Sequence, residues 1–105
     1  MKTDYEFLKT EVDGHILTVT INRPDRMNAL HPPAHAEFDE VWNEFDKDEN
    51  LWVGIVTGEG DRAFSAGNDL KFQAEAGGKM DINMASSGFA GLTSRFNLTK
   101  PLIAA

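Results

Sequence analysis

Apolar residues recur along this chain with two periodicities, one alternating as in a strand and one with the spacing of a helix. Residues 5–12 alternate loosely between apolar and polar, which predicts a strand. Residues 15–21 are rich in Ile, Val and Thr, which suit a pleated sheet, and predict the returning strand. Asp13 and Gly14 lie between these runs, so we expect a hairpin turn there. Pro24 ends the second strand, because proline cannot donate a hydrogen bond to a strand ladder.

The segment with helical periodicity follows a pair of prolines. Pro32 suits the first turn of a helix, so we expect a helix to begin near it. The acidic residues between Glu37 and Glu49 fall on its other faces, and we interpret them as solvated surface. Residues 51–57 then form an apolar run that predicts a buried strand, and this order suits a strand, crossover helix and parallel strand. The apolar helix positions are spaced i, i+3, i+4 and i+7: Phe38, Val41, Trp42 and Phe45.

A polar loop with several glycines follows the buried strand. Residues 58–62 predict a turn, and residues 63–70 predict an irregular loop that leads into a helix with Asp69 at its N-cap. We interpret Asp69 as a cap rather than a catalytic acid. Gly67 allows a ligand to approach the backbone closely, and Phe64 is expected to be an apolar anchor beneath the loop. Such a loop can bind a phosphate, a carboxylate or a developing oxyanion.

The last third of the chain is less regular. Residues 76–79 are expected to break the helix that follows the loop. Residues 88–98 predict another helix, and residues 101–105 predict the start of a buried strand. Because an apolar strand stops in mid-run at the end, we expect the sequence to be a fragment. The helical spacing is carried by Phe89, Leu92 and Phe96.

Composition narrows the classes of function. At 105 residues we expect one small domain at most, and no apolar stretch approaches the roughly 20 residues of a membrane-spanning helix. The net charge of −7 argues against nucleic acid and against an anionic membrane surface as partners. The absence of cysteine excludes disulfides and thiolate zinc sites and permits a reducing compartment, so we expect a cytoplasmic protein.

The histidines do not predict a metal site. His31 and His35 are four residues apart, but no glutamate follows His31, so the zinc-protease pattern fails. We expect these two and His15 to lie at the surface or to cap elements, and we predict no metal.

Residues 63–70 resemble the first oxyanion-hole segment of the crotonase superfamily, the enoyl-CoA hydratase/isomerase family. Further segments match that family in order and approximate spacing and cover almost the whole chain: Ile21–Pro24 with Met27–Leu30, Trp52–Gly58 and Lys100–Ala105. The resemblance implies an α/β fold in which ββα units spiral, as in ClpP-like proteins. It also implies that residues 1–105 are the N-terminal portion of a single crotonase core domain, truncated before a second oxyanion loop.

The same resemblance implies an enzyme that binds acyl-CoA thioesters. Two backbone N–H groups hold the thioester oxygen as it gains enolate character, each contributing roughly 3–4 kcal/mol at comparable sites. The first donor here is the N–H of Asn68, and the second donor and the acid/base glutamates lie beyond Ala105. We expect enoyl-CoA hydration or isomerisation in fatty-acid or related CoA-ester metabolism, with the 105-residue chain alone inactive. Coenzyme A is part of the substrate, no other cofactor is expected, and family members form trimers or dimers of trimers.

The resemblance also assigns substrate contacts. Arg26 and Lys71 are the expected phosphate partners, although Arg23 and Arg26 are equally suited to structural ion pairs. The full set of expected substrate-binding residues is Arg26, Met27, Ala29, Ala66, Gly67, Asn68, Asp69, Leu70 and Lys71.

Two other readings of the sequence stay open. Residues 58–63 match G-x-G-x-x-A after a strand, which is typical of dinucleotide binding only if a helix opens within those glycines. Alternatively the chain is a non-catalytic fragment or interaction module whose exposed apolar faces make it self-associate.

Overall fold

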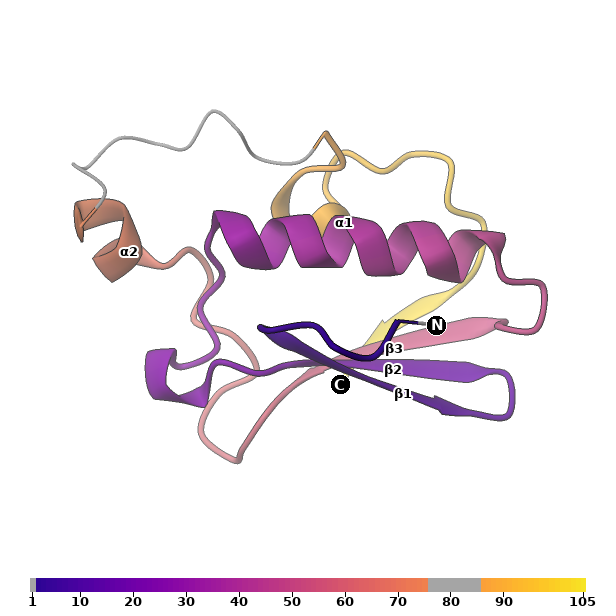
Figure 1. The fold of residues 1–105 in the computed structure, drawn as a ribbon, viewed down its shortest axis with the longest axis horizontal. Coiled ribbons are helices and arrows are strands. Elements are labelled where there is room, and N and C mark those ends of the chain that lie inside the picture. The colour runs from indigo at the N-terminus through magenta and orange to yellow at the C-terminus, as the bar shows by residue number, and fades with distance from the viewer. Residues whose placement is uncertain (1, 76–85) are drawn as a thin grey trace.

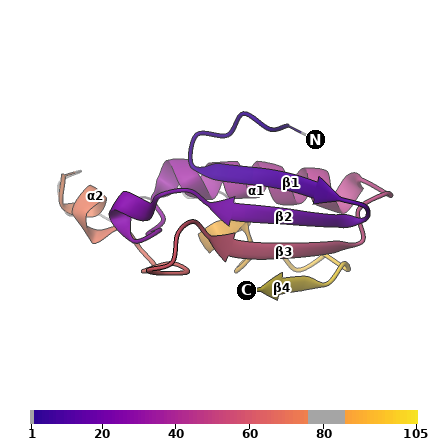
Figure 2. The same ribbon diagram turned by 90° about the horizontal axis from the view of Figure 1, so that it is seen from below.

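The computed structural model describes residues 2–75 and 86–105. Four strands form one sheet in the order β1-β2-β3-β4, and helix α1 lies across one face of it (Figures 1 and 2). Within the described ranges, no helix is both long enough and apolar enough to cross a bilayer. The elements are β1 (Leu8–Asp13), β2 (Ile16–Ile21), the 3-10 helix η1 (Pro24–Arg26), α1 (Pro32–Lys47), β3 (Val53–Gly58), α2 (Leu70–Glu75), the 3-10 helix η2 (Phe89–Gly91) and β4 (Leu102–Ala104).

The sheet contains one hairpin and two parallel pairings. β1 and β2 are antiparallel, and their two connecting residues are Gly14 and His15, one position later than predicted. Gly14 has a φ of 60°, which a residue with a side chain adopts less readily. β2 and β3 are parallel and are connected by α1, which confirms the predicted strand, helix and strand unit. β4 pairs in parallel with β3.

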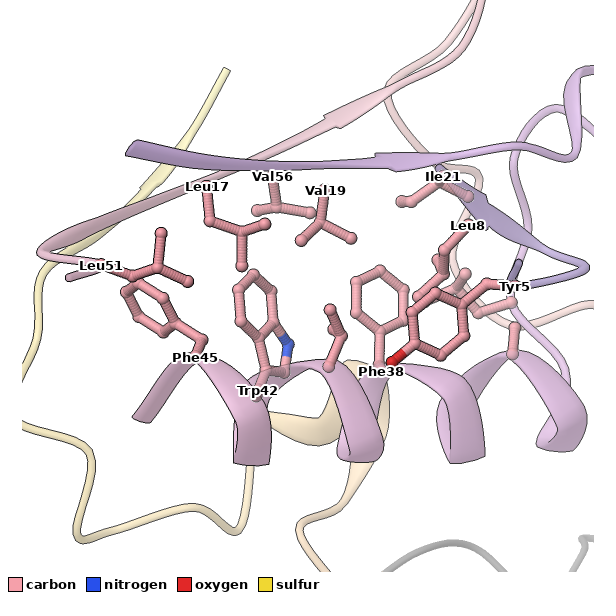
Figure 3. Packing of buried hydrophobic residues seen from close by; sticks show 13 residues of the cluster. Tyr5, Leu8, Leu17, Val19, Ile21, Phe38, Trp42, Phe45, Leu51 and Val56 are labelled. Atoms are coloured by element: carbon pink, nitrogen blue, oxygen red, sulfur yellow. The ribbon is translucent and has the colours of Figure 1, made fainter. Parts of the chain in front are cut away.

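The core lies between α1 and the sheet. All four predicted apolar positions of α1 are fully buried, and they face the inward side chains of β2 and β3 (Figure 3). Burying a side chain of this size contributes about 1.5–3 kcal/mol to the free energy of folding, so the packing of this layer stabilises the fold substantially. The sheet side of the layer consists of Leu17, Val19, Ile21 and Val56, with Leu8 and Leu51 at its ends.

The predicted helix over residues 88–98 is wrong. Only the short η2 forms, and Ala90 and Gly91 have positive φ angles of 55° and 67°. Side chains of α1 explain this, because Trp42 Nε1 donates to the Ala90 carbonyl at 2.9 Å and His35 Nδ1 accepts the Ala90 N–H at 2.9 Å. These tertiary hydrogen bonds replace the local ones that a helix would make.

Two apolar predictions fail at the sheet edges. β4 is an exposed edge strand rather than a buried one, with Ile103 51% exposed. Trp52 precedes β3 and is 58% exposed, and its ring stacks on His15 with 3.5 Å between ring centroids. The predicted helix break at residues 76–79 lies outside the described residues.

The two tryptophans give a matched test of this core. Trp42→Ala removes a fully buried indole and is expected to lower the free energy of unfolding by about 3–5 kcal/mol, because a cavity remains. Trp52→Ala removes an exposed indole and should cost less than about 1 kcal/mol. Urea unfolding followed by circular dichroism measures both, and similar losses in the two variants would contradict this core.

Candidate anion-binding loop

The loop that joins β3 to α2 lies against the segment that follows β2. The Leu30 N–H donates to the Gly67 carbonyl at 2.7 Å, and the Asp69 N–H donates to the Leu30 carbonyl at 2.8 Å. The Ala66 N–H donates to the Met27 carbonyl at 2.9 Å. The loop is therefore fixed by main-chain hydrogen bonds on both sides of residue 68.

The backbone N–H of Asn68 takes no part in this pairing. Within residues 2–75 and 86–105 it has no hydrogen-bond acceptor, whereas the preceding Gly67 N–H donates to Ser65 Oγ at 3.1 Å. Asn68 is exposed, and its side chain is occupied by a hydrogen bond to Gln73 Oε1 at 2.8 Å. An unpaired N–H on an exposed residue of a fixed loop can donate to an anionic or polarised oxygen of a ligand.

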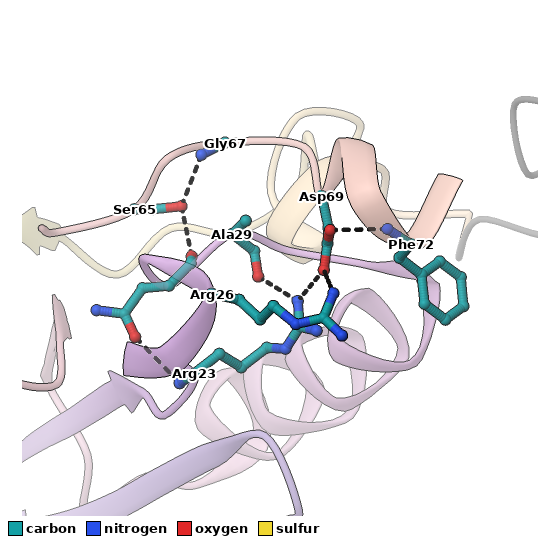
Figure 4. Close-up of polar contacts among 8 residues, drawn as sticks. Arg23, Arg26, Ala29, Ser65, Gly67, Asp69 and Phe72 are labelled. Carbon is teal, nitrogen blue, oxygen red and sulfur yellow. Dashed lines mark hydrogen bonds and ion pairs between the residues drawn. The ribbon is translucent and has the colours of Figure 1, made fainter. Parts of the chain in front are cut away.

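Asn28 fixes the base of the loop. Its side chain is buried: Oδ1 accepts the Arg23 N–H at 3.0 Å, and Nδ2 donates to the carbonyls of Glu59 and Ala63 at 3.0 and 2.8 Å. Its own carbonyl accepts the Ser65 hydroxyl at 2.8 Å (Figure 4). Asn28 is not among the expected substrate-binding residues, although it lies in the Met27–Leu30 motif that carries the family resemblance.

Asp69 connects the loop to the two arginines of the η1 region. Its Oδ1 accepts the Phe72 N–H at 2.9 Å, which confirms the predicted N-cap. Its Oδ2 forms ion pairs with Arg23 Nη1 at 2.9 Å and Arg26 Nη1 at 3.5 Å (Figure 4). Burial alone would raise the pKa of Asp69, but the Phe72 N–H and the Arg23 guanidinium outweigh it and lower that pKa. The carboxylate is therefore ionised and serves as a structural partner.

Two histidines are core residues, which corrects the expectation that they lie at the surface or cap elements. His31 precedes α1 but makes no side-chain cap; its ring packs edge-on against Phe7 and Phe72, with centroids 4.4 and 5.1 Å away. Burial, with a smaller effect of the Arg23 charge, lowers the pKa of His31 to about 4. His35 is 1% exposed, and burial lowers its pKa too. His15 is at the surface, as expected.

The expected substrate-binding residues divide by exposure. Asp69 and Ala29 are buried, and the Ala29 carbonyl accepts a hydrogen bond from Arg23 Nη1. Arg26 keeps 30% of its side chain exposed beside its ion pair, and Gly67 is half-buried. The remaining expected residues are exposed: Met27, Ala66, Asn68, Leu70 and Lys71.

Phe64 is not the predicted apolar anchor, because it is 44% exposed. Close main-chain packing takes that role, because a Cβ added at Gly58 would clash with the carbonyl oxygens of Phe64 and Ala63. Two hollows flank this part of the loop. One of about 200 Å³ is lined by Met27, Asn28 and residues 59–63, and the other, of about 270 Å³, extends to Ala105.

This sheet, crossover helix and loop define the class of the protein. They match part of the fold of solved crotonase-fold enzymes. The crystal structure of a carnitinyl-CoA hydratase from Mycobacterium avium matches with a TM-score of 0.81 and 33% identity, covering 94% of this chain and 38% of that one. An enoyl-CoA hydratase from Mycobacterium tuberculosis matches with a TM-score of 0.79 and 35% identity, covering 94% and 37%.

Sequence comparison specifies the family. The family model for enoyl-CoA hydratase/isomerase matches residues 11–105, and the chain belongs to that family. The carnitinyl-CoA dehydratase of Escherichia coli K12 is 46% identical over 100 residues, which are 95% of this chain and 38% of the relative. That of Citrobacter koseri is 47% identical over 92 residues, 88% of this chain and 34% of the relative. The chain thus spans little more than a third of the curated relatives it matches.

The buried His31 predicts an acid-sensitive stability. The unfolded chain takes up this proton near pH 6.5 and the folded chain only near pH 4, so acid favours unfolding. The stability that depends on a neutral His31 is fully present above pH 6.5 and is lost as the pH falls toward 4. From this residue alone we expect a loss of about 2 kcal/mol between pH 7 and pH 5, measured by urea unfolding at both pH values.

His31→Gln should reduce that pH dependence, whereas the matched exposed variant His15→Gln should retain it. An unchanged pH dependence in His31→Gln would contradict the assignment of the acid sensitivity to this buried ring.

Proposed function

We propose that this chain is the N-terminal part of an enzyme that binds acyl-CoA thioesters, and that the Asn68 N–H is one donor of its oxyanion hole. The observation that carries the proposal is a single one. In the described part of the chain the amides of Ala66, Gly67 and Asp69 are paired, while the amide of Asn68, an exposed residue, has no acceptor. A preorganised donor of this kind stabilises the charge that develops on a thioester oxygen.

The proposed reaction is the addition or removal of water at a CoA-linked acyl chain. Deprotonation next to a thioester carbonyl gives an enolate-like oxyanion, and the Asn68 N–H lowers the energy of that charge. The relatives named carnitinyl-CoA dehydratase and the structures named hydratase support this direction over double-bond isomerisation. Isomerisation stays the second candidate, because the family description includes both reactions.

The substrate contacts belong to the same proposal. In this proposal Arg26 and Lys71 bind the phosphates of coenzyme A. Met27 lines the hollow of about 200 Å³ beside the loop. We further propose that the enzyme needs no cofactor besides this substrate, acts in the cytoplasm, and works as a homo-oligomer built from trimers. The second oxyanion donor and the acid/base glutamates are proposed to lie in a part of the enzyme beyond residue 105.

The alternatives fare differently. α2 begins at Leu70, seven residues after the G-x-G-x-x-A segment, so no helix opens on those glycines as dinucleotide binding requires. The interaction-module alternative rests on exposed apolar side chains, among them Trp52, Leu70 and Phe96. Concentration-dependent self-association of the 105-residue chain, unaffected by acyl-CoA, would favour it.

A pair of substitutions tests the backbone role of Asn68 in the full-length enzyme. Asn68→Pro removes the N–H, and we expect kcat for hydration of a short enoyl-CoA to fall by about 100-fold or more. Asn68→Ala keeps the N–H and loses only the contact to Gln73, so kcat should stay within about threefold of wild type. Equal losses in the two variants would contradict a backbone donor and indicate a side-chain role.

The 105-residue chain alone is expected to be inactive. It supplies one proposed oxyanion donor, and the carboxylate next to that donor, Asp69, is ion-paired and caps a helix. The absorbance of the enoyl thioester should therefore not change when the purified chain is added. Measurable hydration above a heat-denatured control would show that this segment contains a complete catalytic site.

A further inference from the structure

One guanidinium links the two sides of the Leu30–Asn68 pairing. Arg23 Nη1 donates to the carbonyl of Ala29 and lies 2.9 Å from Asp69 Oδ2. Ala29 directly precedes Leu30, and Asp69 directly follows Asn68. The same nitrogen therefore holds together the two chain segments whose main-chain hydrogen bonds flank the free N–H (Figure 4).

This contact is withdrawn from water. The Arg23 side chain is 8% exposed and the Asp69 side chain 4%. A buried ion pair is demanding in geometry, because either partner left alone is strongly destabilised. Arg23 is also fixed from its own backbone, since its N–H donates to the buried Asn28 side chain. The guanidinium is thus a rigid link rather than a surface ion pair.

The charge of this group also matters for an anionic ligand. Asp69 is the ionised carboxylate next to Asn68 in the chain, and by itself it would oppose negative charge at the Asn68 N–H. Arg23 and Arg26 both pair with it, which leaves the group with a net positive charge. Arg26 is the weaker link, since it lies 3.5 Å away and is 30% exposed.

We propose that Arg23 is a positioning residue that acts through Asp69 to fix the Asn68 N–H and to offset the adjacent negative charge. The fixing of the loop depends only on the contacts described above. Its consequence for catalysis rests on the proposed function, so the two are measured separately.

The first measurement is amide hydrogen exchange by NMR on the 105-residue chain. Arg23→Lys should speed exchange of the Leu30 and Asp69 amides by about tenfold or more, with little change in the amides of β2. Arg95→Lys is the matched control, because Arg95 is 7% exposed and pairs with Asp39 at 3.0 Å on the α1 side. It should leave the Leu30 and Asp69 amides within about twofold of wild type.

The second measurement is steady-state kinetics of the full-length enzyme with a short enoyl-CoA. Arg23→Lys should lower kcat by about tenfold or more while KM changes by less than about threefold, and Arg95→Lys should change neither. Should Arg23→Lys fail to fold, Asp69→Asn replaces it. That variant keeps an oxygen for the Phe72 N–H and removes the charge, and the same local exchange and kcat pattern is expected.

The outcomes separate the two claims. Unchanged exchange at Leu30 and Asp69, or a rise shared equally by the β2 amides, would overturn the positioning role. Locally faster exchange with an unchanged kcat would overturn its catalytic consequence. A wild-type enzyme without activity on any CoA thioester would overturn the proposed function, while the exchange result would still decide whether Arg23 fixes the loop.

Discussion

The loop after β3 must satisfy its main-chain polar groups outside any helix or sheet, and the rest of the site follows from how it does so. It pairs with residues 23–30 through Leu30, and the buried side chains of Asn28 and Arg23 complete the pairing. Each of these groups is costly to bury unpaired, so the contacts hold one another in place. Among the amides of residues 66–69, which lie at this pairing, that of Asn68 has no acceptor in the described part of the chain.

The fold makes this pairing possible. β2 and β3 are parallel and in register, with Ile21 opposite Gly58, so the segments that follow them leave the sheet at the same edge. Segments at the carboxyl ends of parallel strands are the usual place for ligands in α/β proteins. The buried aromatic face of helix α1 packs in one core with side chains of both strands. The core therefore positions the loop without contributing a functional group to it.

Much of this could be predicted from the sequence wherever one local rule decides the structure. The α1 face, the Asp69 cap and the parallel unit are of this kind. The failures share a cause, since they depend on partners distant in sequence. The 88–98 helix gives way to hydrogen bonds from α1, and His31 and His35 are buried by packing that no local pattern encodes. Asn28 lay within a recognised motif, but its role required knowing that residues 59 and 63 fold back onto it.

The most direct test of the account is an NMR titration of the 105-residue chain with butyryl-CoA, a saturated thioester with no double bond to hydrate. A thioester oxygen that accepts a hydrogen bond from Asn68 should move that amide proton downfield, saturably and more than the amides of neighbouring loop residues. Saturable binding that shifts other regions and leaves the Asn68 amide unmoved would contradict the account, as would the absence of binding at millimolar butyryl-CoA.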